Sequence, residues 1–239
     1  MRPEIEELEG WYRGRAGNRA ALSLATAVAP LVRRGATARL LALGYCGPLL
    51  EGFDPAWVER LILACPAEQG SIRWPATGAN LAVEVDELSL PFVDSLFDQA
   101  LVVHSLEHAA PAAQLLGELW RVLAPGGSAI IIVPNRTGMW RHIEKTPFGQ
   151  GTPFGGRQLR RMLEDARFEL DHRQTLLAVP PVSLAGGLDR PVMKLLPRLG
   201  GLHIIRAVKR EGPAMKPVGR ARNRRGRVAG AGLAPSPSC

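Results

Sequence analysis

The sequence is poor in cysteine and in long apolar runs, and each shortage excludes a class of protein. Its cysteines, Cys46, Cys65 and Cys239, are too few and too scattered for a disulfide framework or a paired metal motif. No apolar run reaches the roughly 18 residues that a membrane span needs. The acidic stretch 1–10 does not resemble a signal peptide. We therefore expect reduced thiols, no membrane span and a cytoplasmic location.

Most of the chain also lacks net charge, although the formal charge is +8 over 239 residues. Residues 209–239 hold eight of the 30 Lys and Arg residues but only one of the 22 acidic residues, Glu211. Residues 1–208 are therefore almost neutral, which argues against a nucleic-acid-binding domain. The tail is rich in Gly and Pro and has no apolar periodicity, which predicts disorder. The alternative is a basic arm that contacts nucleic acid or anionic lipid.

What the sequence does contain is a succession of short apolar runs and helical patterns, typical of an α/β protein. Helical patterns cover 18–32, 111–123 and 157–166. Strands are predicted at 39–43, 60–65, 81–85, 98–103, 129–133, 168–178 and 202–208. We expect helices between the first five strands, and hence a single Rossmann-like domain over 1–208 with a doubly wound sheet of about seven strands. An irregular insert rich in Pro and Gly covers 180–201.

The most informative stretch is a polar corner, His-Ser-Leu-Glu-His at 104–108, that directly follows an apolar run. A helical pattern, a Pro-Gly-Gly turn and a second apolar run come after it, which together form one crossover unit of a parallel sheet. Ligands bind beyond the carboxyl ends of the strands in such sheets. The corner is therefore expected to lie at a binding or catalytic site.

Several linked segments between Asp86 and Val133 resemble class I S-adenosylmethionine-dependent methyltransferases of the type 11 group. These segments are Leu90-Pro91-Phe92, Ser95-Leu96-Phe97-Asp98, Leu106-Glu107-His108, Trp120-Arg121-Val122-Leu123 and Pro125-Gly126-Gly127. The resemblance implies a methyl transfer from S-adenosyl-L-methionine to a small or lipid-like molecule. It also implies that the corner after the fourth strand, His104 to Glu107, faces the methyl group and the substrate.

The resemblance places the cofactor against the ends of the first three strands. The glycine turn after strand one is Gly44-Tyr45-Cys46-Gly47-Pro48, and Asp86 with its neighbour Glu87 is placed for the adenine end. Two positions depart from the family pattern. Ala42 stands where the family has an acidic residue, and Cys65-Pro66 stands where an Asp or Glu holds the ribose, with Glu68 three residues later. These departures leave open a non-catalytic binding or regulatory module with this fold.

His104 and Glu107 are the candidate catalytic residues. An imidazole suits a general base at neutral pH, although a pocket histidine that only shapes the site is the alternative. Glu107 could instead cap the following helix. The spacing His104, Glu107, His108 also matches the H-x-x-E-H zinc motif, but a strand end does not supply the helical face which that motif requires.

Candidate substrate contacts follow strand five. Asn135 and Arg136 could contact an acidic substrate group. Trp140 is the first residue of a glycine-rich, partly aromatic segment, 140–154, whose length predicts a lid. Trp11 and Tyr12 could close the pocket from the opposite side. A methyltransferase that acts on RNA or protein, guided by the tail, is a further alternative.

Overall fold

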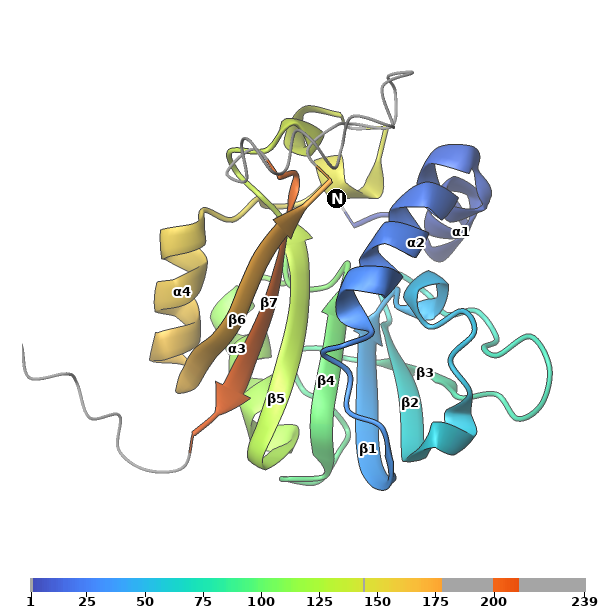
Figure 1. Ribbon diagram of the computed structural model, residues 1–239, viewed down its shortest axis with the longest axis vertical. Helices are drawn as coiled ribbons and strands as arrows, with labels where there is room; N and C mark the ends of the chain where they lie inside the picture. Colours follow the sequence, from blue (N-terminus) through green and yellow to red (C-terminus); the bar gives the residue numbers. More distant parts are fainter. Residues whose placement is uncertain (1, 144, 178–199, 211–239) are drawn as a thin grey trace, which may run out of the picture.

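The computed structural model describes residues 2–143, 145–177 and 200–210. Its strands form one seven-stranded sheet in the order β3-β2-β1-β4-β5-β7-β6 (Figure 1). The bounds are β1 Gly35–Gly44, β2 Val58–Pro66, β3 Ala82–Val85, β4 Phe97–Val103, β5 Leu123–Pro134, β6 Phe168–Leu176 and β7 Leu202–Lys209. β1 to β5 pair in parallel, and β7 runs antiparallel between β5 and β6. The predicted single Rossmann-like sheet of about seven strands is confirmed.

Within the described part of the chain, four α-helices cover the two faces of this sheet: α1 Ile5–Arg13, α2 Arg15–Val28, α3 Ala112–Val122 and α4 Gly156–Asp165. Side chains alternate along a strand, so Leu40 packs with the α1 and α2 residues on one face. Leu41 packs with the α3 and α4 residues on the other. Both leucines are almost fully buried, as expected for central parallel strands with both faces covered.

The connections between the first five strands differ from the prediction. Among the described residues, only the β4–β5 connection holds an α-helix, α3, whereas β1 and β2 are joined through the 3-10 turns η1 Gly47–Leu49 and η2 Pro55–Trp57. Pro48, Gly52 and Pro55 in this short connection disfavour an α-helix. α1 was not predicted, although Ile5, Leu8 and Tyr12 share one buried helical face.

The last strand, β7, extends one residue beyond 208, the predicted end of the folded body. Lys209 is the last residue of β7 and is buried. Its Nζ donates a hydrogen bond of 2.6 Å to the Leu123 carbonyl and lies 4.1 Å from the centre of the Trp120 ring. Residues 211–239 of the predicted tail and 180–199 of the predicted insert lie outside the described residues. None of the described helices is long and apolar enough to cross a membrane.

Arg121 on α3 holds the loop between β3 and β4 in place. Its guanidinium donates to the carbonyls of Leu90 at 2.8 Å and Phe92 at 2.7 Å. Glu118, one turn earlier, accepts from Arg121 at 2.9 Å and from the Leu90 N–H at 2.9 Å. The Leu-Pro-Phe and Trp-Arg-Val-Leu segments that carry the family resemblance therefore contact each other in the fold.

Candidate functional site

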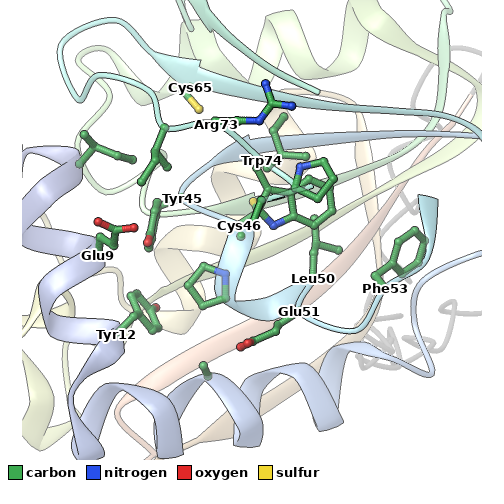
Figure 2. Close-up of a pocket in the computed structure, with 18 of the residues that line it drawn as sticks. Glu9, Tyr12, Tyr45, Cys46, Leu50, Glu51, Phe53, Cys65, Arg73 and Trp74 are labelled. Atoms are coloured by element: carbon green, nitrogen blue, oxygen red, sulfur yellow. The ribbon is translucent and has the colours of Figure 1, made fainter. Parts of the chain in front are cut away.

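A cavity of about 620 Å³ opens at the carboxyl ends of β1 and β2, beneath α1 (Figure 2). The turn after β1 supplies one wall, and the loop between β2 and β3 supplies another. Polar and aromatic side chains from four segments line it: Glu9, Tyr12, Arg13, Tyr45, Glu51, Cys65, Arg73 and Trp74. Its position is the one that a parallel sheet favours for ligand binding.

Gly44 ends β1 at the wall of this cavity because no other residue fits there. Its φ is +85°, and a Cβ atom at this position would lie 2.0 Å from the Val103 carbonyl oxygen. The next residue, Tyr45, donates its N–H to the same oxygen at 2.9 Å. The glycine thus lets the ends of β1 and β4 approach each other, which brings the turn next to the polar corner.

Charged groups of both signs face the cavity. Glu9 and Glu51 contribute carboxylates and Arg73 a guanidinium, while Arg13 forms an ion pair with Glu9 at 2.8 Å. The Trp74 indole reaches across to the turn, since a Cβ atom on Gly47 would lie 3.4 Å from it. A ligand with an ammonium group, a carboxylate and a flat ring would find complementary partners here.

The cavity thiols are not nucleophiles. Burial raises the pKa of Cys65 to about 11, with a further contribution from Glu84. Burial also raises the pKa of Cys46, whose Sγ donates to the Leu43 and Leu101 carbonyls at 3.4 Å each. A thiol reacts as its thiolate, so both cysteines stay inert at neutral pH.

The polar corner joins three side chains in a row. The Tyr12 hydroxyl of α1 lies 2.8 Å from Nε2 of His104, and Nδ1 of His104 lies 3.4 Å from a carboxylate oxygen of Glu107. All three residues are buried. The predicted catalytic pair therefore does lie together, and Tyr12 extends it toward the cavity.

Burial and charge act in opposite senses on this row. Burial raises the pKa of Glu107, but the His104 ring, which lies 3.4 Å away, and the nearby His108 outweigh it and lower that pKa. Burial raises the pKa of Tyr12 well above its usual value, and Tyr45 and Glu107 add to the effect. At neutral pH, Glu107 is therefore a carboxylate and Tyr12 a neutral phenol.

Aromatic rings cover His104 on its other side. The Phe148 ring lies 4.6 Å from the imidazole, and Trp140 and Trp11 lie 5.7 and 5.9 Å from Phe148. Phe148 and Trp140 come from η4 Pro147–Gly149 and η3 Met139–His142, within the predicted lid. The imidazole is fully shielded from solvent.

The predicted cofactor residues fall into two groups. Gly44, Tyr45 and Gly47 line the cavity. Asp86 and Glu87 are not among its lining residues. The Asp86 side chain is exposed and accepts the Leu88 N–H at 2.8 Å. The buried Glu87 carboxylate pairs with Arg2 and accepts the Ser105 hydroxyl. Glu68 is exposed and lines a separate open hollow beside Gly149 to Gly151.

The predicted substrate residues have structural partners instead. Asn135 is buried, donating to the Gly200 carbonyl at 2.7 Å and accepting the Thr137 N–H at 3.1 Å. Arg136 donates to the Gln158 side chain at 2.9 Å. Trp140 is buried in the aromatic cluster. None of these three lines the cavity, because each is used to fold the segment after β5.

Two alternatives for the corner do not fit the structure. His104 directly follows β4 with φ of +54°, and the residues up to His108 form a bend and a turn. The two histidines therefore do not share a helical face as the zinc motif requires. Glu107 does not cap α3 either. That helix begins at Ala112 with Pro111 at the N-cap and no side-chain cap bond.

Residues 66–131 match a family model described as a methyltransferase domain. The demethylmenaquinone methyltransferase of Thermus thermophilus is 36% identical to this chain over 76 residues. That match covers 31% of this chain and 34% of the relative, so the chain spans about a third of the relative's length. The matched family segment contains β3, β4, α3 and the polar corner.

Solved structures share the fold across most of the chain. An S-adenosylmethionine-dependent methyltransferase of Thermotoga maritima aligns with a TM-score of 0.62 and 20% identity, covering 86% of this chain and 96% of that one. A similar enzyme of Archaeoglobus fulgidus gives 0.57 and 17%, covering 79% and 94%. The cyclase SpnF gives 0.54 and 22%, covering 83% and 82%.

The family match covers residues 66–131, and the solved methyltransferases share the fold of most of the chain. S-adenosylmethionine is the cofactor named for the Thermotoga maritima structure. The cavity of this chain would accommodate that molecule in size, since about 620 Å³ lies within the range of ligand pockets. The charges also fit, because Glu9, Glu51 and Arg73 complement its ammonium and carboxylate groups. Cys65, near the end of β2, also lines the cavity.

Proposed function

We propose that this protein transfers a methyl group from S-adenosylmethionine to a small or lipid-like molecule. The observation that carries the proposal is the cavity at the carboxyl ends of β1 and β2, which has Gly44 at its base and Tyr12 on its wall. Bound there, the cofactor would supply a methyl group that is already strongly electrophilic. The protein then has to bind, align and exclude water, which can account for most of the lowering of the barrier.

In this proposal the turn after β1 holds the amino-acid end of the cofactor. Glu9 and Glu51 bind its ammonium group and Arg73 its carboxylate, while Trp74 and Tyr45 offer flat rings to the adenine. Cys65 provides only a weak acceptor for the ribose, so we expect micromolar affinity, roughly −6 to −8 kcal/mol.

The aromatic cluster supports an apolar acceptor molecule. Trp11, Trp140 and Phe148 gather beside His104, and a planar acceptor ring would pack against them. The similarity to a demethylmenaquinone methyltransferase points the same way, toward a lipid-like ring compound with a protic group. Because His104 is fully buried, the protic group of such a molecule would meet the buried row at Tyr12, which lines the cavity.

Calorimetric titration of the full chain with S-adenosylmethionine and with S-adenosylhomocysteine tests the cofactor site. We expect micromolar binding of both and at least tenfold weaker binding by Gly47→Val, because the added side chain points at Trp74. Gly117→Ala on α3 is the matched control, since nothing lies within 4 Å of a Cβ atom there. Absence of any heat at millimolar ligand would remove the proposal.

A binding or regulatory module without catalysis is the second candidate, favoured by Cys65 at the ribose position and by the shielded His104. A methyl-transfer screen against quinols, phenols, carboxylates and amines separates the two. Cofactor binding without transfer to any acceptor would support the module.

A further inference from the structure

Tyr12 is the only member of the buried row that reaches the cavity. Tyr12 lines the cavity, whereas His104 and Glu107 are not among its lining residues. Nε2 of His104 faces the Tyr12 hydroxyl at 2.8 Å, and its Nδ1 faces Glu107 at 3.4 Å. Phe148 closes the remaining side of the ring at 4.6 Å. A molecule in the cavity can therefore exchange a proton with His104 only through the tyrosine.

We propose that Tyr12 contacts the protic group of the methyl acceptor and relays its proton to His104, which Glu107 orients. This inference rests on the proposed methyl transfer. The sequence had suggested that His104 contacts the substrate, and the proposal assigns this contact to Tyr12. His104 then receives the proton from Tyr12, and Glu107 positions His104.

The protons in the row are fixed by the groups at its two ends. Glu107 is ionised, and one of its oxygens lies 3.4 Å from Nδ1 without forming a hydrogen bond. In the proposal the imidazole carries its proton on Nδ1, which faces this negative charge. Nε2 then carries a lone pair, to which the neutral Tyr12 hydroxyl donates. This arrangement leaves lone-pair capacity on the Tyr12 oxygen on the cavity side, where it can accept the hydrogen of an acceptor O–H or N–H.

The transfer balances in atoms and charge. As the acceptor atom forms its bond to the methyl carbon, the carbon–sulfur bond breaks and the sulfur keeps the electron pair. The acceptor's proton passes to the Tyr12 oxygen while the Tyr12 proton passes to Nε2 of His104. The resulting imidazolium is stabilised by the Glu107 carboxylate. After product release the proton returns through Tyr12 to water, which restores the neutral row.

Nitrogen-15 NMR of the full chain labelled at histidine tests the row without any substrate. The His104 signals are assigned by their loss in His104→Gln. We expect a protonated Nδ1 and an unprotonated Nε2 in the wild type. Tyr12→Phe should shift the Nε2 resonance and leave Nδ1 protonated. Tyr45→Phe, a neighbouring cavity tyrosine whose ring lies 5.5 Å from that of Tyr12, should leave Nε2 unchanged.

A proton on Nε2 in the wild type, or no Nε2 shift in Tyr12→Phe, would overturn the relay. Glu107→Gln provides an independent variant if Tyr12→Phe does not fold, and it should reduce the share of the imidazole that is protonated at Nδ1. An unchanged tautomer in that variant would equally contradict the proposal.

Activity separates the relay from a purely structural contact. Once an acceptor is found, Tyr12→Phe should lower kcat by ~10²-fold or more while the calorimetric affinity for S-adenosylhomocysteine changes less than about threefold. Trp57→Phe, an exposed residue on η2, is the control for turnover. Full turnover in Tyr12→Phe would refute the relay. Absence of transfer by the wild type would instead refute the proposed function, and the NMR result would still decide the proton placement.

Discussion

Two segments of the chain, 35–65 and 66–131, meet along β1 and β4 at the centre of the sheet but are built differently. The segment 66–131, which matches the methyltransferase family, holds a regular β4–α3–β5 crossover with a buried polar corner. The segment 35–65, which precedes the match, joins β1 to β2 through 3-10 turns and has Cys65 at the end of β2. The family likeness therefore comes from the crossover and its corner. The cavity wall on the other side has a composition of its own.

This difference separates the elements that make the fold from those that set ligand affinity. Arg121 and the apolar faces of β4 and α3 hold the matched segment together through buried contacts. The cavity wall, by contrast, consists largely of half-buried loop residues such as Trp74 and exposed ones such as Arg73. A loop can change its composition at little cost in stability, and with it the ligand that the site accepts.

Gly44→Ala should have the largest effect, because it breaks the contact between the two segments. The added methyl group would meet the Val103 carbonyl at 2.0 Å with φ of +85°. We expect a loss of at least about 3 kcal/mol in the free energy of unfolding, or no folded protein. Gly52→Ala is the control, since φ is +79° there but nothing lies within 4 Å. Urea unfolding measures both, and equal losses would contradict the role of this contact.

Arg121→Met should destabilise the matched segment by roughly 1–3 kcal/mol, because two loop carbonyls lose charged donors and Glu118 loses its partner. Urea unfolding compares it with Arg160→Met on α4, whose exposed ion pair with Glu164 is worth less than about 0.5 kcal/mol. If the Arg121 variant lost no more than this control, the loop would not depend on the guanidinium.

His108 should make the corner sensitive to acid. Burial, together with the charges of His104 and Arg2, lowers its pKa to about 4 against the opposing effect of Glu107. The folded state therefore binds fewer protons than the unfolded state, and stability is lost as the pH falls from about 6.5 to about 4. Between pH 7.5 and 4.5, the wild type should lose roughly 1–2 kcal/mol more than His108→Gln, after allowance for solvent screening. Parallel pH profiles of the two proteins would contradict this prediction.

Cys65→Asp would place a carboxylate at the end of β2 and so test whether the composition of the cavity wall limits the affinity for the cofactor. If the ribose of the cofactor lies there, we expect about tenfold tighter binding of S-adenosylhomocysteine, or about 1.4 kcal/mol. Cys65→Ser controls for size without adding charge, and calorimetry measures both. Identical affinities in the three proteins would place the ribose elsewhere.

All seven strands were predicted, and most of them are short apolar runs between polar or Gly and Pro residues. β6 is the exception, since most of its residues are polar. The turn residues Gly44 and Gly47 were found from their place after the first strand. The contact between Tyr12 and His104 could not be predicted from the sequence, because the two residues are 92 positions apart. Asp86 and Asn135 looked like ligand contacts because they follow strands, yet their side chains bond to nearby backbone N–H groups, as Asp and Asn commonly do in turns.

The anchored end of β7 has a practical consequence for binding experiments. Lys209 is fixed by Leu123 at the start of β5 and by Trp120 of α3. It therefore lies at the amino-terminal end of the parallel strands, whereas Gly44 and the cavity lie at their carboxyl ends (Figure 1). A linker or fluorophore joined just after this strand would be rigidly seated yet distant from the cavity mouth. The protein could be immobilised on a sensor surface at this end, with its cavity facing the flowing ligand.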